Sequence, residues 1–167
     1  MKTLYLIRHA EAIASAPPLM GDYERILSKK GAEDAHKAAH FICACPLPDF
    51  VLGSASVRTL QTARIITALL LDKEGKKIQS QFTRSLYLAS MQVLQDEIAS
   101  VSDDFNSLLV TAHNPGIADL AMMLSQGRLS DFTQDFSTAT CAVFEGDVSS
   151  WIDISPDSLR LKNVFTP

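Results

Sequence analysis

The chain has few cysteines and no long hydrophobic run, and both absences narrow the class of protein. Its three cysteines, Cys43, Cys45 and Cys141, cannot form an even disulfide framework, and no His or Cys lies at a zinc-like spacing beside the first two. The apolar run 3–7 before Arg8 is too short for a signal peptide or a membrane span. We therefore expect free thiols, a cytoplasmic location and no membrane association.

The chain also lacks an excess of positive charge. Fifteen basic residues against 19 acidic ones leave a formal net charge of −4, so a broad surface for binding nucleic acid is not indicated. With 7 Gly and 7 Pro in 167 residues, and 47% hydrophobic residues, the composition excludes a disordered or fibrous chain. A chain of this length buries roughly 70% of its unfolded surface. We predict a single domain spanning residues 1–167, with no need of disulfide or metal support.

Short apolar runs alternate with segments of helical periodicity along most of the chain. The predicted strands are 3–7, 50–52, 78–82 and 107–112. Four helices are predicted. The first follows Ser28 as its N-cap, the second covers 57–71, and the third follows Ser90 as its cap. The fourth has Asn114 as its N-cap and Pro115 as its first helical residue. Two further β-like runs, 138–144 and 148–154, flank Gly146-Asp147 and indicate a hairpin. This order predicts an α/β three-layer sandwich: a mostly parallel central sheet with an antiparallel edge, and helices on both faces.

Polar side chains follow three of the predicted strands at the point where each strand ends. Arg8 and His9 end the first strand, Arg58 lies in the first turn of the helix after the second, and His113 follows the fourth. Because ligands of open α/β sheets bind at the carboxyl ends of the strands, we expect these four side chains to share one crevice.

Two guanidiniums and two imidazoles beside helix N-termini suit a phosphoryl group. A neutral imidazole can attack phosphorus and form a covalent phosphohistidine. The arginines and a cationic second histidine would stabilise the charge of the transition state.

Four segments carry a family resemblance. The segment Leu6-Ile-Arg-His-Ala-Glu11 resembles the signature of the histidine phosphatase superfamily, which includes the cofactor-dependent phosphoglycerate mutases. Residues 22–31, 54–63 and 112–116 resemble the family's approach to its first helix, its second-arginine motif and its second-histidine motif. The short length, the His-Asn-Pro-Gly form of the last motif and Leu86-Tyr87 most resemble the SixA-type phosphohistidine phosphatases.

The resemblance implies a phosphoglycerate mutase-like fold and a metal-independent phosphatase. It also implies that His9 is the nucleophile and that Arg8, Arg58 and His113 line the phosphate pocket. The sequence departs from the family at Ala10, where a Gly is usual, so we expect a slightly reshaped loop there.

A second departure concerns the general acid. Many members carry a carboxylate after the third strand, but residues 83–90 contain no Asp or Glu. An alkoxide leaving group needs a proton, because hydroxyl pKa values lie near ~15. An imidazole nitrogen, with a pKa of about 6.5, can leave protonated or nearly neutral and so has less need of a general acid. The sequence therefore favours a phosphoramidate substrate, namely phosphohistidine on a protein.

Further polar residues are candidates for substrate binding: Glu11, Asn114, Arg25 and Arg84. His36 and His40 lie four residues apart on one predicted helix, but no third ligand is evident, so we expect no metal and no cofactor. The expected partner is a histidine-phosphorylated protein, and the expected assembly is a monomer or a small homo-oligomer. Two alternatives stay open: a phosphomonoesterase of small metabolites with Glu11 as general acid, and a phosphate-binding regulatory module without turnover.

Overall fold

A six-stranded sheet with the strand order β3-β2-β4-β1-β5-β6 forms the centre of the structure, a computed structural model that describes residues 1–15, 20–75, 77–131 and 135–167. The strands are β1 (Lys2–Arg8), β2 (Phe50–Ser54), β3 (Gln79–Thr83), β4 (Ser107–Ala112), β5 (Cys141–Gly146) and β6 (Arg160–Phe165). Strands β1 to β4 pair in parallel, whereas β5 and β6 are antiparallel. The predicted sheet with an antiparallel edge is confirmed.

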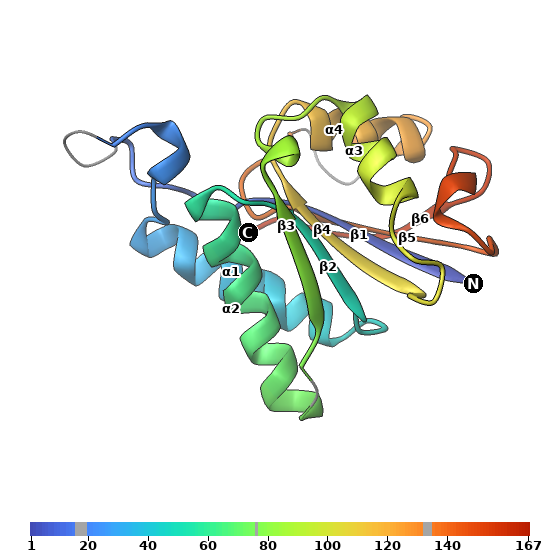
Figure 1. Ribbon diagram of the computed structural model, residues 1–167, viewed down its shortest axis with the longest axis horizontal. Coiled ribbons are helices and arrows are strands. Elements are labelled where there is room, and N and C mark those ends of the chain that lie inside the picture. The colour runs from blue at the N-terminus through green and yellow to red at the C-terminus, as the bar shows by residue number, and fades with distance from the viewer. Residues whose placement is uncertain (16–19, 76, 132–134) are drawn as a thin grey trace.

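Helices cover both faces of this sheet (Figure 1). Helices α1 (Lys29–Cys43) and α2 (Val57–Glu74) lie on one face, and α3 (Met91–Ala99) and α4 (Gly116–Leu124) lie on the other. The predicted three-layer arrangement is thus confirmed. Within the described ranges, no helix combines the length and the hydropathy needed to cross a bilayer.

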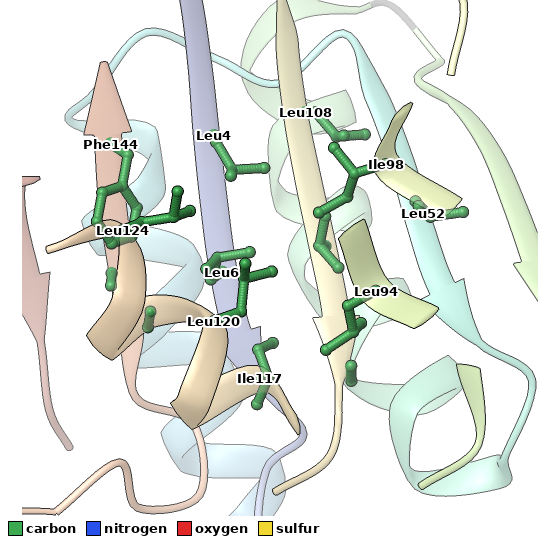
Figure 2. Close-up of a cluster of buried hydrophobic side chains, with 14 of the residues drawn as sticks. Leu4, Leu6, Leu52, Leu94, Ile98, Leu108, Ile117, Leu120, Leu124 and Phe144 are labelled. Atoms are coloured by element: carbon green, nitrogen blue, oxygen red, sulfur yellow. The ribbon is translucent and has the colours of Figure 1, made fainter. Parts of the chain in front are cut away.

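Strand β1 is buried on both faces, and its side chains alternate between two hydrophobic clusters. Leu4 and Leu6 pack with α3 and α4, whereas Tyr5 and Ile7 pack with α1 and α2. Figure 2 shows the first cluster, where leucines and isoleucines of α3 and α4 meet those of the central strands. A fully buried aliphatic side chain contributes about 1.5–3 kcal/mol, and a slip of one residue would move each of them to the wrong face. The core therefore fixes the register, and with it the strand ends.

Two predicted helix caps are confirmed and one is wrong. Ser28 Oγ accepts a hydrogen bond from Gly31 N (2.9 Å), and Ser90 Oγ accepts one from Val93 N (3.4 Å). Asn114 is not the N-cap of α4, because the helix begins at Gly116 with Pro115 in the N-cap position. The Asn114 side chain is engaged elsewhere: its Nδ2 donates to the carbonyl oxygen of residue 136 (2.9 Å).

The predicted C-terminal hairpin is wrong in its second strand. β5 pairs instead with β6, and residues 151–153 form a short 3-10 turn. The reason is Trp151, which is buried and donates from its backbone N to Asp103 Oδ1 (2.8 Å) and from Nε1 to the Phe105 carbonyl (3.1 Å). The Lys2 ammonium also donates to the backbone carbonyl oxygens of Asp103 and Phe105. These contacts hold the segment over the α3–β4 loop, away from the sheet.

Helix α1 meets the loop after β1 at Gly31, and this contact leaves no room for a side chain. A Cβ atom at residue 31 would lie 2.0 Å from the carbonyl oxygen of Glu11. We expect Gly31→Ala to lower the free energy of unfolding by about 1–3 kcal/mol, because the backbones must separate. Urea unfolding measures the loss, with Glu33→Ala, an exposed position on the same helix, as control. An unchanged midpoint for Gly31→Ala would contradict this packing.

Candidate active site

The carboxyl ends of β1, β2 and β4 bring four polar side chains to one open cavity of about 420 Å³. Arg8 pairs with Ala112 in the sheet register, so His9 and His113 leave adjacent strands side by side. Their ring centroids lie 5.0 Å apart. Arg58, in the first turn of α2, lies against both rings. The spatial arrangement expected from the strand ends is present.

The His9 ring has a defined tautomer. Its Nδ1 lies 2.8 Å from the carbonyl oxygen of Ala10, so Nδ1 carries the hydrogen. Arg58 Nε donates to His9 Nε2 (3.3 Å), which leaves the lone pair of the ring on Nε2. Burial, together with the charges of Arg58, Arg8 and Arg25, lowers the pKa of His9 to about 4. At neutral pH, His9 therefore presents an unprotonated nitrogen to the cavity.

The His113 ring has the opposite tautomer. Arg58 Nη2 lies 3.5 Å from Nδ1, and a guanidinium can only donate, so Nδ1 is the acceptor. Nε2 then carries the hydrogen and donates to Ser54 Oγ (2.9 Å). Burial, together with the charges of His9 and Arg58, lowers the pKa of His113 to about 3. The second histidine, whose protonation state the sequence leaves open, is thus neutral in the free site, and a bound phosphate would raise its pKa.

Arg58 is the central cation of the cavity, and it is almost fully buried. Its Nη1 donates to the Asp22 carbonyl (2.5 Å) and its Nη2 to Asp22 Oδ2 (2.8 Å). Its guanidinium also lies 5.8 Å from the Tyr87 ring centroid. Arg58 therefore links the two histidines to the short 3-10 turn Asp22–Glu24.

Asp22 is the residue that sequence reasoning missed. Its carboxylate accepts hydrogen bonds from Tyr87 Oη (2.7 Å), Arg25 Nη1 (2.8 Å) and Arg58 Nη2 (2.8 Å). The Tyr87 hydrogen bond, followed by those of Arg25 and Arg58, holds the pKa of Asp22 far below its usual range. Asp22 is therefore an ionised acceptor, and it has no proton to give to a leaving group.

Arg8 and Asn114 converge on one carbonyl from two strand ends. Arg8 Nη1 (3.1 Å) and Asn114 Nδ2 (2.9 Å) both donate to the backbone oxygen of Phe136. Arg8 Nε and Asn114 Oδ1 are buried, and among the described residues no hydrogen bond reaches either atom. Because a buried polar atom without a partner costs about 1–3 kcal/mol, Arg8 Nε is suited to donate a hydrogen bond to a ligand oxygen.

The remaining predicted binding residues divide into two groups. Arg25 and Glu11 line the cavity, where Arg25 Nε donates to the Ile13 carbonyl (2.7 Å). Arg84 is not among the lining residues of this cavity. Its guanidinium lies over the Tyr23 ring, 4.9 Å from the centroid, and the Tyr23 ring in turn packs edge-on against Tyr87.

Ala10 fits the loop without a left-handed backbone. Its side chain is fully buried, and its N–H donates to Thr62 Oγ1 (3.0 Å) on α2. The non-glycine residues with positive φ in the described ranges are Leu88, Gln126 and Ala139. The methyl group of Ala10 packs with Ala35 and Ala139. Within the same ranges, no group of three His, Cys, Asp or Glu side chains is placed to hold a metal ion.

Comparisons with known proteins agree with this geometry. A family model described as the histidine phosphatase superfamily (branch 1) matches residues 4–77. A solved structure described as a candidate phosphohistidine phosphatase SixA from Nakamurella multipartitia is 27% identical, with a TM-score of 0.82 over 99% of this chain and 96% of that chain. The first part of the chain thus matches the histidine phosphatase superfamily, and the whole chain resembles SixA-type structures in fold. The predicted resemblance and the phosphoglycerate mutase-like fold are thereby confirmed.

Two more proteins are similar to this chain over nearly their whole length. A candidate SixA structure from Agrobacterium tumefaciens is 25% identical, with a TM-score of 0.81 over 99% of this chain and 98% of that one. An uncharacterised protein of Mycobacterium tuberculosis is 27% identical over 96% of this chain and 99% of its own length. Since these matches cover 96–99% of this chain, the likeness extends well beyond residue 77.

We expect the stability of this protein to fall as the pH is lowered from about 6.5 to about 4. An unfolded histidine titrates near pH 6.5, whereas the pKa values in the folded protein are about 4 for His9 and about 3 for His113. In this window the unfolded chain binds more protons, so acid favours unfolding. The loss is on the order of a few kcal/mol. Urea unfolding from pH 4 to 7 measures it, and His113→Gln should flatten the slope. An equal slope in both proteins would contradict the buried neutral state.

Proposed function

We propose that this protein hydrolyses phosphohistidine carried by another protein, through a covalent phosphoryl group on His9. In the first step the Nε2 lone pair of His9 attacks phosphorus, and the leaving imidazole takes the electron pair of the broken P–N bond. In the second step water attacks phosphorus and frees His9. Arg8, Arg58 and His113 bind the phosphoryl oxygens, whose charge the guanidiniums offset in both transition states.

The protonation state of Asp22 is the observation that favours phosphohistidine as the substrate. Both oxygens of this carboxylate already accept hydrogen bonds from cations or from Tyr87, and its pKa lies far below its usual range. The segment after β3, where many family members place a general acid, brings the Tyr87 hydroxyl and Leu88 to the site. A missing general acid costs roughly 10²–10⁴-fold in the cleavage of an ester. An imidazole leaving group avoids most of this cost.

Exposed apolar side chains beside the cavity favour a protein substrate. Leu88 lines the cavity, is 54% exposed, and has a φ of 50°, a left-handed conformation that costs energy for a leucine. Met20 and Ile26, which flank the Asp22 turn in sequence, are also exposed. Apolar groups held at the rim of a polar site suit contact with a protein surface.

We expect Leu88→Asp to reduce the preference for a phosphorylated protein over a small phosphate compound by about 10-fold, because one apolar anchor is worth about 1–3 kcal/mol. The ratio of the two kcat/KM values measures this preference. Ile152→Asp, at an exposed apolar position on the 3-10 turn Trp151–Asp153, is the control and should keep the wild-type ratio. Equal ratios for all three proteins would argue against docking at this rim.

The test of the proposed function is selectivity between bonds. The wild-type protein is incubated with a histidine-phosphorylated carrier protein, with phosphoserine and with p-nitrophenyl phosphate. The proposal predicts rapid P–N cleavage and little release from phosphoserine. Rapid cleavage of phosphoserine would instead favour the phosphomonoesterase, and phosphate binding without release would favour the regulatory module. A single functional domain, a cytoplasmic location and a monomeric or small homo-oligomeric state are parts of the same proposal.

A further inference from the structure

The charges that line the cavity nearly balance, although its ligand is an anion. Three guanidiniums, those of Arg8, Arg25 and Arg58, face the carboxyl groups of Glu11 and Asp22. A phosphoryl dianion would more than neutralise the single excess positive charge. A proton on His113, or a proton carried on the ring of a phosphohistidine substrate, would restore the balance.

The two acidic side chains differ in their capacity to accept another hydrogen bond. Asp22 already accepts hydrogen bonds from three donors, at least one on each oxygen. Glu11 Oε1 accepts from Ser28 Oγ (2.6 Å), but among the described residues no hydrogen bond reaches Glu11 Oε2. Oε2 forms an ion pair with Lys30 Nζ at 3.9 Å, which is too long for a hydrogen bond, and the Glu11 side chain lines the cavity and is 43% exposed. Glu11 therefore offers one oxygen to a ligand.

The chemistry of the P–N bond requires a proton at a particular place. A phosphohistidine ring has one nitrogen bonded to phosphorus and one distal nitrogen. If the distal nitrogen carries hydrogen, the ring departs as neutral imidazole; without it, the ring must depart as an anion. A group that keeps the distal nitrogen protonated at neutral pH therefore replaces a general acid.

We propose that Glu11 Oε2 accepts a hydrogen bond from the distal ring N–H of a phosphohistidine substrate and so selects the protonated, reactive ring. This inference rests on the proposed function and names the residue that recognises the leaving group. The Ala10 carbonyl oxygen has the corresponding role for the nucleophile, because it keeps the hydrogen on His9 Nδ1. The phosphoryl group passes between two imidazoles, each protonated at its distal nitrogen.

Atoms and charges balance in both steps under this arrangement. In the first, the His9 Nε2 electron pair forms the new bond to phosphorus, and the P–N electron pair returns to the substrate ring, which leaves neutral. In the second, the water oxygen bonds to phosphorus and the electron pair returns to His9 Nε2. His9 keeps its Nδ1 hydrogen, and the product departs as the phosphate monoanion with both hydrogens of the water.

The proposal has a signature in the pH dependence. An anionic partner within hydrogen-bond reach raises the pKa of an imidazole by about 1–3 units. The charged groups around Glu11 are Lys30 on α1 and Arg25, Asp22 and Arg58 in the cavity. They remain in Glu11→Gln, and the glutamine oxygen can still accept from Ser28 Oγ. The alkaline limb of kcat/KM for phosphohistidine should therefore move down by about one pH unit or more in this variant.

The experiment compares wild type, Glu11→Gln and Glu33→Gln on free phosphohistidine and on p-nitrophenyl phosphate from pH 5 to 9. p-Nitrophenolate leaves without a proton, so the ratio of the two kcat/KM values isolates the contribution of the ring. We expect Glu11→Gln to lower this ratio at pH 8 by at least about 10-fold, the equivalent of one pKa unit. Glu33 is exposed on α1, and Glu33→Gln should keep the wild-type ratio.

The outcomes separate the inference from the proposed function. A wild-type protein that leaves both free phosphohistidine and a histidine-phosphorylated carrier protein intact would overturn both. If wild type is active and Glu11→Gln keeps the same ratio and the same alkaline limb, the inference alone is overturned. An equal loss of kcat/KM on both substrates would also overturn it, because that loss indicates a structural role for Glu11 at Ser28. Turnover of phosphoserine that Glu11→Gln abolishes would identify Glu11 as a general acid and would also overturn it.

Discussion

Replacing His9 with alanine should lower phosphohistidine turnover by at least about 10⁴-fold, because loss of an enzyme's nucleophile removes the covalent route. The structure gives two reasons. His9 is neutral at physiological pH, with a pKa of about 4, and its Nε2 lone pair points toward Arg58 in the cavity. The His113 lone pair lies on Nδ1 beside Arg58 Nη2, and its Nε2 is committed to Ser54. His113 is also less exposed than His9 (1% against 9%), so it is less accessible to a phosphorylated substrate.

The matched control for this prediction is His40→Ala, at an exposed position on α1. Phosphate release from a histidine-phosphorylated protein is measured for wild type and both variants, after circular dichroism shows that each is folded. His40→Ala should retain wild-type rates. If His9→Ala kept more than about a tenth of the wild-type rate, another group would have to be the nucleophile.

The second large effect is expected from Arg58→Lys, which should reduce kcat/KM by about 10²–10³-fold. A lysine keeps the positive charge but cannot form the planar fork of donors that Arg58 uses. Three separate contacts depend on that fork: Nε to His9 Nε2, Nη1 to the Asp22 carbonyl and Nη2 to Asp22 Oδ2. Removal of one preorganised donor to a developing oxyanion already costs about 2.7–4 kcal/mol.

Arg64→Lys supplies the control, because Arg64 is exposed on the same helix. Steady-state kinetics on phosphohistidine and the binding of orthovanadate, a phosphate analogue, are measured for both variants. Arg58→Lys should weaken vanadate binding as well as turnover, and Arg64→Lys should change neither. Wild-type vanadate affinity in Arg58→Lys would mean that Arg58 does not contact the phosphoryl group.

The sequence predicted the strand ends and therefore most of the site. Apolar runs that stop at Arg8-His9 and at His113 mark the carboxyl ends of buried strands, and parallel pairing brings those ends together. Ser28 and Ser90 were correctly predicted as caps because N-capping is a local property. These features depend on residues close together in the chain, which periodicity and spacing can describe.

The features that the sequence did not reveal depend on contacts between distant residues. Asp22 lies 36 residues from Arg58 and 65 from Tyr87, and its role is set by both. Its neighbour Arg25 was a weak signal, since an acid three residues before an arginine can form an ion pair. The second strand of the hairpin was misplaced because Trp151 is held by Asp103 and Phe105, which no local pattern indicates.

The most direct test of the account is to trap the phosphorylated protein. A histidine-phosphorylated carrier protein labelled with radioactive phosphate is mixed with the enzyme, quenched within milliseconds in alkali, where a P–N bond survives, and digested for mass spectrometry. The account predicts up to one phosphoryl group per chain, located on His9 and absent in His9→Ala. Rapid turnover with no phosphate on His9, or with phosphate on His113 or on a carboxylate, would contradict it.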